Sequence, residues 1–305
     1  MIARPLGSEA TMSDRLPRRN DTVVTLVITV SAVVVLALGG CQAAGSHSGS
    51  GSGAASASAS DASAAATAAS TPAPSSARPS PSAETTCVKV ADQRCDYPPY
   101  PAIAGASSDP YVDQNIWSGS KRYQQTLHAI SPGNWYVTAN ANTHFGSVLT
   151  YPNTGFEMTG AVASYSSIKS SFSTSIPDNA RTAGWAAYDL WFNDWHDEVM
   201  IQTDITANSN YDCVPKARAT IDGQPWHLCV FGAERVWKPG TDDHHLVNQA
   251  SGTIDVQAFL TWLGQHGYLP ADSTWDAASY GFEICDTGGT NEVFRVSAFS
   301  WIARK

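Results

Sequence analysis

Three acidic residues lie inside apolar stretches of the chain, where their carboxyl groups could do acid–base chemistry together. Asp189, Glu198 and Glu283 occur in the stretches YDLWF, DEVMIQ and GFEIC. Successive side chains of a β-strand point to opposite faces, so each acid would face away from its apolar neighbours. Two carboxyl groups across a cleft are the apparatus of glycoside hydrolysis. The alternative is that all three are ordinary solvent-facing acids on strands with one apolar face.

Motifs for other kinds of catalysis are missing from the sequence. It contains no HExxH motif, no paired CxxC, no GxSxG elbow and no glycine-rich phosphate loop. His244 and His245 are adjacent, and neighbouring side chains cannot easily reach one metal ion together. We therefore expect no metal site.

The elements that must position the acids are predicted to be strands. Alternating segments recur along the chain and are separated by Gly, Pro, Asn and Asp, a pattern typical of a sandwich or barrel. Only one stretch has helical periodicity, at 255–263, with Asp255 near its start and Gly267 after its end. The prediction is an all-β antiparallel domain with one surface helix. The predicted strands are 135–140, 147–151, 186–193, 198–205, 217–221, 224–231, 279–285 and 293–301.

Charge is distributed unevenly along the 305 residues. Residues 1–86 contain five basic and five acidic residues, so residues 87–305 carry the whole formal net charge of −9. An acidic domain is a poor match for a phosphate backbone, which excludes nucleic acid as a partner and favours a neutral or weakly polar one.

The N-terminal segment 1–41 has the organisation of a targeting signal. Three arginines within 15–19 precede an uncharged apolar run, 22–40. The run ends in Leu-Gly-Gly-Cys, which resembles a bacterial lipobox and implies that Cys41 is lipidated. The predicted location is extracytoplasmic, either lipid-anchored or secreted, with membrane contact only through this anchor. An uncleaved membrane span is the alternative, because 19 apolar residues are long enough to cross a bilayer.

Composition divides the rest of the chain into a linker and a folded domain. Residues 42–86 are almost entirely Ala, Ser, Gly, Thr and Pro, too few apolar groups to offset chain entropy, so we predict a disordered tether. Residues 87–305 form the folded domain.

Cysteines in an exported domain can form disulfides. Cys87 and Cys95 are close in sequence and are predicted to pair. Cys213 and Cys229 are predicted to pair as well, although a turn at 222–223 would bring residue 232 opposite Cys213. That second bond therefore needs an irregular connection, and Cys285 remains without an assigned partner.

Several of these segments resemble glycoside hydrolase family 12, and the resemblance covers about residues 87–305. It implies a two-sheet β-jelly-roll sandwich that binds β-1,4-glucans, xyloglucan or mixed-linkage glucan and hydrolyses them internally, with retention and without a cofactor. The segments that carry it are AYDL at 187–190, EVMI at 198–201, GFE at 281–283, YVDQNIW at 111–117, YPN at 151–153, the helix with Leu269-Pro270 after it, and FSW at 299–301.

The resemblance implies catalytic roles for the three acids. Glu198 corresponds to the nucleophile and Glu283 to the general acid/base, and Asp189 would lie beside the nucleophile and help to set its ionisation. A retaining mechanism requires the two catalytic carboxyl groups to be about 5–5.5 Å apart, one of them protonated at rest. Neighbouring acids push each other's pKa values apart, which is how one stays protonated.

The resemblance also implies a sugar-binding surface, with departures. Asn115 and Trp117 would bind sugar on the non-reducing side of the cleft, and Met200 would line the catalytic subsite. Gln202 stands where the family commonly has Trp, and Cys285 stands where it often has a bulky residue. Both changes reduce the aromatic lining. The indoles of Trp191, Trp195 and Trp237 are candidates to compensate, and the alternative for each is a place in the core or at the rim.

The functional hypothesis is a secreted, monomeric, retaining endo-glycosidase that cleaves β-1,4-linked glucans in polysaccharide catabolism. Its partner is the polysaccharide substrate. The alternative is a non-catalytic cell-surface glycan-binding protein on the same scaffold, which Gln202 and Cys285 favour and the presence of all three acids opposes.

Overall fold

A computed structural model describes residues 86–90, 93–97, 103–117, 123–143, 147–209, 213–270 and 272–305. The predicted signal segment, Cys41 and the linker up to residue 85 lie outside the described residues. Within the described part of the chain, no helix is long and apolar enough to cross a membrane.

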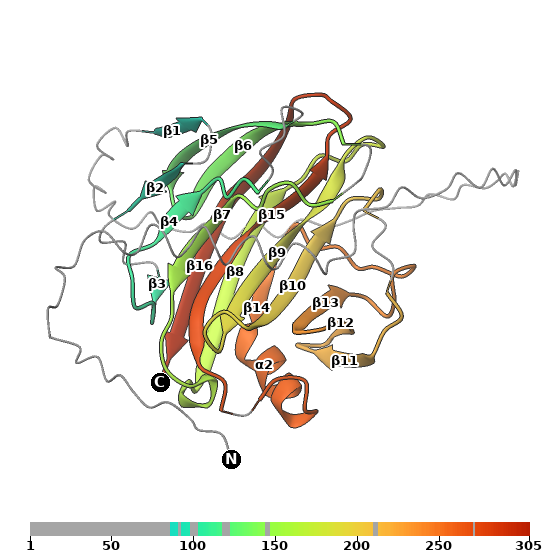
Figure 1. Ribbon diagram of the computed structural model, residues 1–305. Coiled ribbons are helices and arrows are strands. Elements are labelled where there is room, and N and C mark those ends of the chain that lie inside the picture. Colours follow the sequence, from blue (N-terminus) through green and yellow to red (C-terminus); the bar gives the residue numbers. More distant parts are fainter. Residues whose placement is uncertain are drawn as a thin grey trace, which may run out of the picture. The chain divides into compact units, whose positions relative to one another are not determined.

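The described strands form two sheets that face each other (Figure 1). The seven-stranded sheet has the order β1-β5-β6-β16-β8-β14, with β3 on the edge of β16, and the nine-stranded sheet has the order β11-β12-β13-β10-β9-β15-β7-β4-β2. The first contains β1 (Cys87–Val90), β3 (Ile103–Ala104), β5 (Tyr123–Ser131), β6 (Asn134–Ala141), β8 (Ser167–Ser175), β14 (Ser251–Asp255) and β16 (Glu292–Arg304). The second contains β2 (Arg94–Asp96), β4 (Tyr111–Asp113), β7 (Asn153–Glu157), β9 (Ala183–Phe192), β10 (Asp197–Ile205), β11 (Ala217–Ile221), β12 (Gln224–Phe231), β13 (Glu234–Pro239) and β15 (Trp275–Asp286).

The all-β sandwich prediction is confirmed, with two local differences. Most strand pairs are antiparallel, but β10 pairs with β13, and β3 with β16, in parallel. The predicted strand 147–151 is reduced to bridges in which Thr150 contacts Ile116 on one side and Ile284 on the other. Pro152 follows immediately and has no N–H to continue the ladder.

A continuous apolar core lies between the sheets. Tyr188, Leu190 and Phe192 of β9 point into it, and so do Val199 and Ile201 of β10. Aromatic rings of the two sheets meet edge to face there, for example Trp135 and Phe282, with ring centroids 5.5 Å apart. This packing holds the central strands of the nine-stranded sheet rigidly, with their other face turned away from the core.

The predicted helix is present as α2 (Val256–Gln265). A short 3-10 helix lies much earlier in the chain, at Val162–Ser164. The Asp255 side chain caps α2 by accepting from the Ala258 N–H at 3.0 Å. Its buried residues include Phe259, whose ring packs on Trp226 and Trp237 with centroids 4.9 and 5.6 Å away. The helix thus covers the end of the core beside β8.

Both predicted disulfides are present, Cys87–Cys95 and Cys213–Cys229. The β11–β12 hairpin pairs Ala217 with Leu228, and residues 213–216 before it do not continue the ladder regularly. This irregular connection brings Cys213 to Cys229 rather than to residue 232. No cysteine among the described residues, Cys285 included, is a free thiol.

Candidate active site

The three acids singled out in the sequence lie on adjoining central strands of one sheet. Glu198 is on β10, Asp189 on β9 and Glu283 on β15, and β9 lies between the other two. Their immediate neighbours Val199, Leu190 and Phe282 point into the core. Strand alternation therefore directs all three carboxyl groups to the face away from the core.

That face carries a small apolar cluster of its own, here called the outer cluster. Its members come from β9, β10, β12, β13 and β15 and share the orientation of the acids. They are Ala183, Trp185, Ala187, Met200, Ile205, Cys229, Val236 and Cys285. The carboxyl groups consequently sit in a partly apolar environment, where the charged form is disfavoured.

Asp189 and Glu198 are hydrogen-bonded to each other across β9 and β10. In the register of these strands Asp189 is opposite Met200 and Glu198 is opposite Trp191, so the two acids are diagonal neighbours. The Trp191 indole donates to Asp189 Oδ2 at 3.0 Å. Burial raises the pKa of Asp189 to about 6, although the hydrogen bonds with Trp191 and Glu198 oppose the increase.

Glu198 lies at the centre of the group. Its side chain is buried, with 7% of the residue exposed. Burial raises its pKa well above the usual range, and the negative charges of Asp189, Glu234 and Glu283 raise it further. The ionisation of Glu198 therefore depends on the charges of its acidic neighbours.

Glu283 lies opposite Trp185 of β9 in the register of the two strands. Burial raises the pKa of Glu283 well above its usual range, and the charges of Glu234 and Asp189 add to the effect, while the neighbouring Trp185 side chain lowers it. A raised pKa favours the protonated form, which is the form that a general acid requires.

Glu234 belongs to the same group and was missed in the sequence. It begins β13, which was not among the predicted strands, and it is the parallel neighbour of Glu198. Burial, and then the charge of Asp189, raises the pKa of Glu234 to about 8. The segment ERVW at 234–237 is the signal in the sequence that could have predicted this strand. In it Glu234 and Val236 would share one face, and Trp237 would point to the other.

Tyr151 is a further buried residue, and it contacts both β9 and β15. Its hydroxyl donates to the Ala187 carbonyl at 3.0 Å and lies 3.3 Å from Ser279 Oγ, which donates to it. Burial raises its pKa, and the charges of Asp189 and Glu283 raise it further, which places the phenol near both acids. The sequence indicated the YPN segment but no role for this side chain.

The predicted sugar-binding pair is assembled as a unit. The Trp117 indole donates to Asn115 Oδ1 at 2.8 Å, and Asn115 has the left-handed φ of 41° that asparagine tolerates better than most residues. Ile116 between them bridges to Thr150, which in turn bridges to Ile284 next to Glu283. Both side chains are half-buried, on the β7 side of the acids.

Met200 and Gln202 share the outer face of β10, as expected from their spacing. The Gln202 amide donates to Met200 Sδ at 3.7 Å, and its Oε1 has no partner among the described residues. Of the three indoles expected to compensate for the missing Trp, Trp191 and Trp195 lie together, with ring centroids 5.8 Å apart and Trp195 44% exposed. Trp237 takes the alternative, a place in the core, because β13 turns it to the opposite face from Glu234 and Val236.

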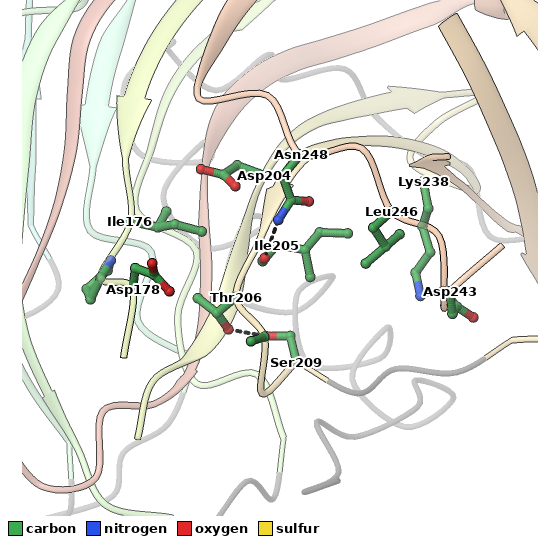
Figure 2. Close-up of a pocket in the computed structure, with 12 residues that line it drawn as sticks. Ile176, Asp178, Asp204, Ile205, Thr206, Ser209, Lys238, Asp243, Leu246 and Asn248 are labelled. Carbon is green, nitrogen blue, oxygen red and sulfur yellow. Dashed lines mark hydrogen bonds and ion pairs between the residues drawn. The ribbon is translucent and has the colours of Figure 1, made fainter. Parts of the chain in front are cut away.

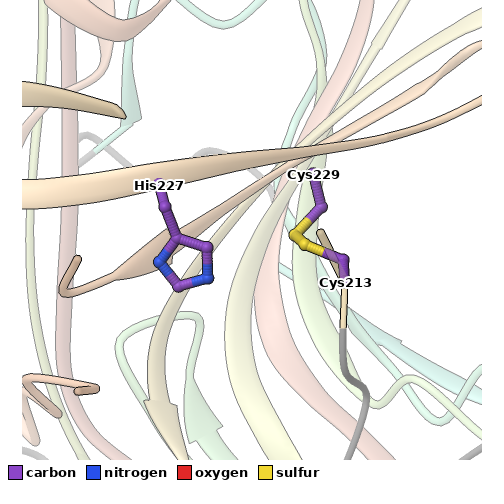
Figure 3. A group of neighbouring side chains, drawn as sticks. All are labelled: Cys213, His227 and Cys229. Atoms are coloured by element: carbon purple, nitrogen blue, oxygen red, sulfur yellow. A yellow bond between two sulfur atoms is a disulfide. The ribbon is translucent and has the colours of Figure 1, made fainter. Parts of the chain in front are cut away.

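Cys213, Cys229 and His227 form a compact group on β12 and the connection before β11 (Figure 3). The sulfur and ring nitrogen atoms lie within 4.8 Å of one another, but the two sulfur atoms are bonded to each other. The His227 ring nitrogens lie 3.1 Å from the Gly240 carbonyl and 3.3 Å from Asp243 Oδ1. The disulfide and the two His227 contacts explain this group as part of the fold rather than as a metal site.

A cavity of about 380 Å³ opens at the ends of β10 and β13 (Figure 2). Asp178, Asp204 and Asn248 contribute to its wall, together with Lys238, which is paired with Asp243. None of the predicted catalytic or sugar-binding residues line it. The cavity is therefore separate from the carboxyl group cluster.

Comparison with solved structures defines the fold class. Endoglucanase Cel12A from Rhodothermus marinus matches with a TM-score of 0.59 and 18% identity, over 72% of this chain and 99% of that one. A family 12 xyloglucanase from Bacillus licheniformis matches with a TM-score of 0.56 and 16% identity, over 72% and 100%. The xyloglucanase domain of NopAA from Sinorhizobium fredii, in complex with cellobiose, matches with a TM-score of 0.55 and 20% identity, over 70% of this chain and 99% of that one.

No family model and no curated relative matches the sequence. At such low identity the structural likeness establishes the fold alone. The chain has the two-sheet β-jelly-roll sandwich of the family 12 glycoside hydrolases.

Proposed function

We propose that this protein is a retaining, endo-acting glycoside hydrolase that cleaves β-1,4-linked glucans. The observation that carries the proposal is the group of Asp189, Glu198 and Glu283, whose buried side chains share the outer face of three adjoining strands. A buried set of acids that perturb one another's pKa values is costly for stability and is typical of acid–base catalysis.

In the proposed mechanism, Glu283 gives its proton to the glycosidic oxygen while the Glu198 carboxylate attacks the anomeric carbon. The bond to the leaving sugar breaks, and an ester between Glu198 and the remaining sugar forms. Glu283 then takes a proton from water, whose oxygen attacks the anomeric carbon and releases Glu198. Asp189 positions Glu198 through their hydrogen bond.

This mechanism makes the stereochemical outcome a direct test. Two displacements leave the configuration unchanged, so NMR during the first minutes of hydrolysis should show the β-anomer of the new reducing end before mutarotation. The α-anomer as first product would show that Glu198 acts as a base on water instead.

The proposed substrate class rests on the fold and on charge. Solved structures of the same fold include endoglucanases and xyloglucanases. An acidic domain suits a neutral polysaccharide, and the Asn115–Trp117 pair offers an aromatic face and polar groups to a pyranose ring. We propose that cellulose-type, mixed-linkage and xyloglucan chains are the candidates, bound by a monomer.

The proposal is tested by measuring release of reducing sugar from a panel of these glucans. Glu198→Gln should abolish turnover and leave glucan affinity nearly unchanged, because a nucleophile acts mainly in the transition state. Glu157→Gln is the matched control, since Glu157 is an exposed glutamate of the same sheet. Wild-type protein that degrades none of the glucans would contradict the proposal.

A non-catalytic glycan-binding protein is the second candidate, favoured by Gln202 and Cys285 in place of bulkier residues. It predicts that the wild type binds a glucan without cleaving it and that Glu198→Gln has no effect. Affinity electrophoresis in gels containing each glucan, beside the activity assay, separates the two candidates.

We also propose that the protein is exported and anchored through a lipid on Cys41, on the basis of the Leu-Gly-Gly-Cys junction. Cys41→Ser should move the protein out of the membrane fraction. A mature N-terminus at another residue, without lipid, would contradict this.

A further inference from the structure

We infer that Glu234 is a sugar-binding residue of the cleft that contacts the substrate on the side of the leaving group. This inference rests on the proposed function and adds a residue that the sequence did not indicate. It begins from the place of Glu234 beside Glu198 on the outer face of the nine-stranded sheet.

The orientation of Glu234 follows from the register of β10 and β13. In this parallel pair Glu198 is opposite Glu234, Met200 is opposite Val236, and Ile201 is opposite Trp237. Met200 and Val236 belong to the outer cluster, whereas Ile201 and Trp237 belong to the core. Glu234 therefore shares the face of Glu198, and its strand lies about 4.8 Å away, the usual spacing of neighbouring strands.

The order of the strands places Glu234 at one side of the site. From one edge toward the other the sequence of strands is β13, β10, β9, β15 and β7. Asn115 and Trp117 lie beyond β15, next to Thr150. The resemblance to family 12 implies that they bind sugar on the non-reducing side. A glucan that crosses these strands from the Asn115–Trp117 side meets Glu198 first and Glu234 after it. Glu234 then lies on the reducing side of the cleaved bond.

The carboxyl group of Glu234 has an unused hydrogen-bonding atom. The residue is only 7% exposed, and its Oε2 has no hydrogen-bond partner among the described residues. A buried oxygen without a partner is costly, and such atoms in native proteins call for an explanation such as a ligand. A sugar hydroxyl that donates to Oε2 would satisfy it.

The ionisation of Glu234 is compatible with this role. Its raised pKa, caused by burial and by the charge of Asp189, lets it hold a proton near neutral pH. It can then either accept a hydrogen bond from a sugar hydroxyl or donate one to a sugar oxygen.

The experiment compares two substrates that differ in what they place on the leaving-group side. One is an aryl β-glycoside of cellobiose or cellotriose, which has no sugar there. The other is cellohexaose, or the polymeric glucan that the protein hydrolyses fastest, and both place sugar units on the leaving-group side. Glu234→Met removes the hydrogen-bonding atoms and retains length, and Glu234→Gln retains polar atoms without charge. Glu157→Met and Glu157→Gln are the matched controls.

For Glu234→Met, the loss of kcat/KM on the long substrate should exceed the loss on the aryl glycoside by about tenfold, the upper end of what one neutral hydrogen bond contributes. Glu234→Gln should lose less than Glu234→Met. Equal losses on both substrates with a shifted pH profile would overturn the inference, because Glu234 would then act only on the ionisation of Glu198 and Glu283. Equal losses with a lower Tm would overturn it in favour of a structural role.

Failure of the proposed function itself gives a different result. Wild-type protein would then cleave neither substrate, and calorimetric binding of cellohexaose would replace kcat/KM as the measurement. Weaker binding by Glu234→Met than by wild type and Glu157→Met would still support the contact. Unchanged binding would overturn it.

Discussion

The carboxyl groups of Asp189 and Glu198 are hydrogen-bonded to each other from adjacent strands of the same sheet. Two carboxyl groups can form this bond only when one of them carries a proton. The pair therefore stores a proton at a pH where isolated acids would both be ionised. In the proposed mechanism Glu198 must lose that proton before it can attack.

Asp189→Asn should move the acidic limb of the pH profile of kcat/KM to lower pH. The pKa of Glu198 is raised by burial and then by the charge of Asp189. The amide removes that charge, so the pKa of Glu198 falls and the ionised, active form persists to more acidic pH. The measurement is kcat/KM against pH on one soluble glucan. An acidic limb that stays in place, or that moves to higher pH, would contradict this account of the pair.

Glu283→Gln should impair hydrolysis of unactivated glucans far more than that of aryl glycosides with acidic phenols. Such leaving groups depart with little protonation, so the first step no longer needs the acid. The checks are the rates on an aryl cellobioside series and on a glucan. Equal impairment across the series would show that Glu283 is not the proton donor.

Gln202→Trp should tighten glucan binding by about 1 kcal/mol, the scale of one aromatic contact. Gln202 is opposite Ala187 on β9, and Gly281 is opposite Ala187 on the strand beyond, so small residues lie on that side of the position. Binding is measured in the Glu198→Gln background, with Gln202→Leu as the control for lost polarity. Weaker binding at an unchanged Tm would show that residue 202 does not face the sugar.

Asp243→Asn should lower Tm at neutral pH, and the difference from wild type should shrink near pH 2. Burial alone would raise the pKa of Asp243, but hydrogen bonds with His227, Lys238 and the Cys213 N–H outweigh it and lower the pKa to about 2. A lowered folded-state pKa stabilises the fold above the usual pKa of aspartate, and the stabilisation is lost as pH falls through about 2. Asp272→Asn, at an exposed position, is the control. A Tm difference that is independent of pH would exclude ionisation as the cause.

Much of the candidate site could be predicted from local pattern. The alternation in YDLWF, DEVMIQ and GFEIC indicates which side each acid faces, and the structure has Asp189, Glu198 and Glu283 on that common face. The cap at Asp255 and the Cys87–Cys95 bond were likewise predictable, because each depends on residues close together in the chain.

The sequence by itself determined strand periodicity, the position of the helix and the face of each acid, because these depend on the alternation of neighbouring residues. Only the tertiary structure decided which strands are neighbours. Glu234 lies beside Glu198 through a parallel pairing across 36 positions, and the Tyr151 hydroxyl reaches the Ala187 carbonyl across a similar span. Backbone ladders are chemically alike for every strand, so pairing is selected by packing of the whole core. That selection brought Glu234 to the acids and turned Trp237 away from them.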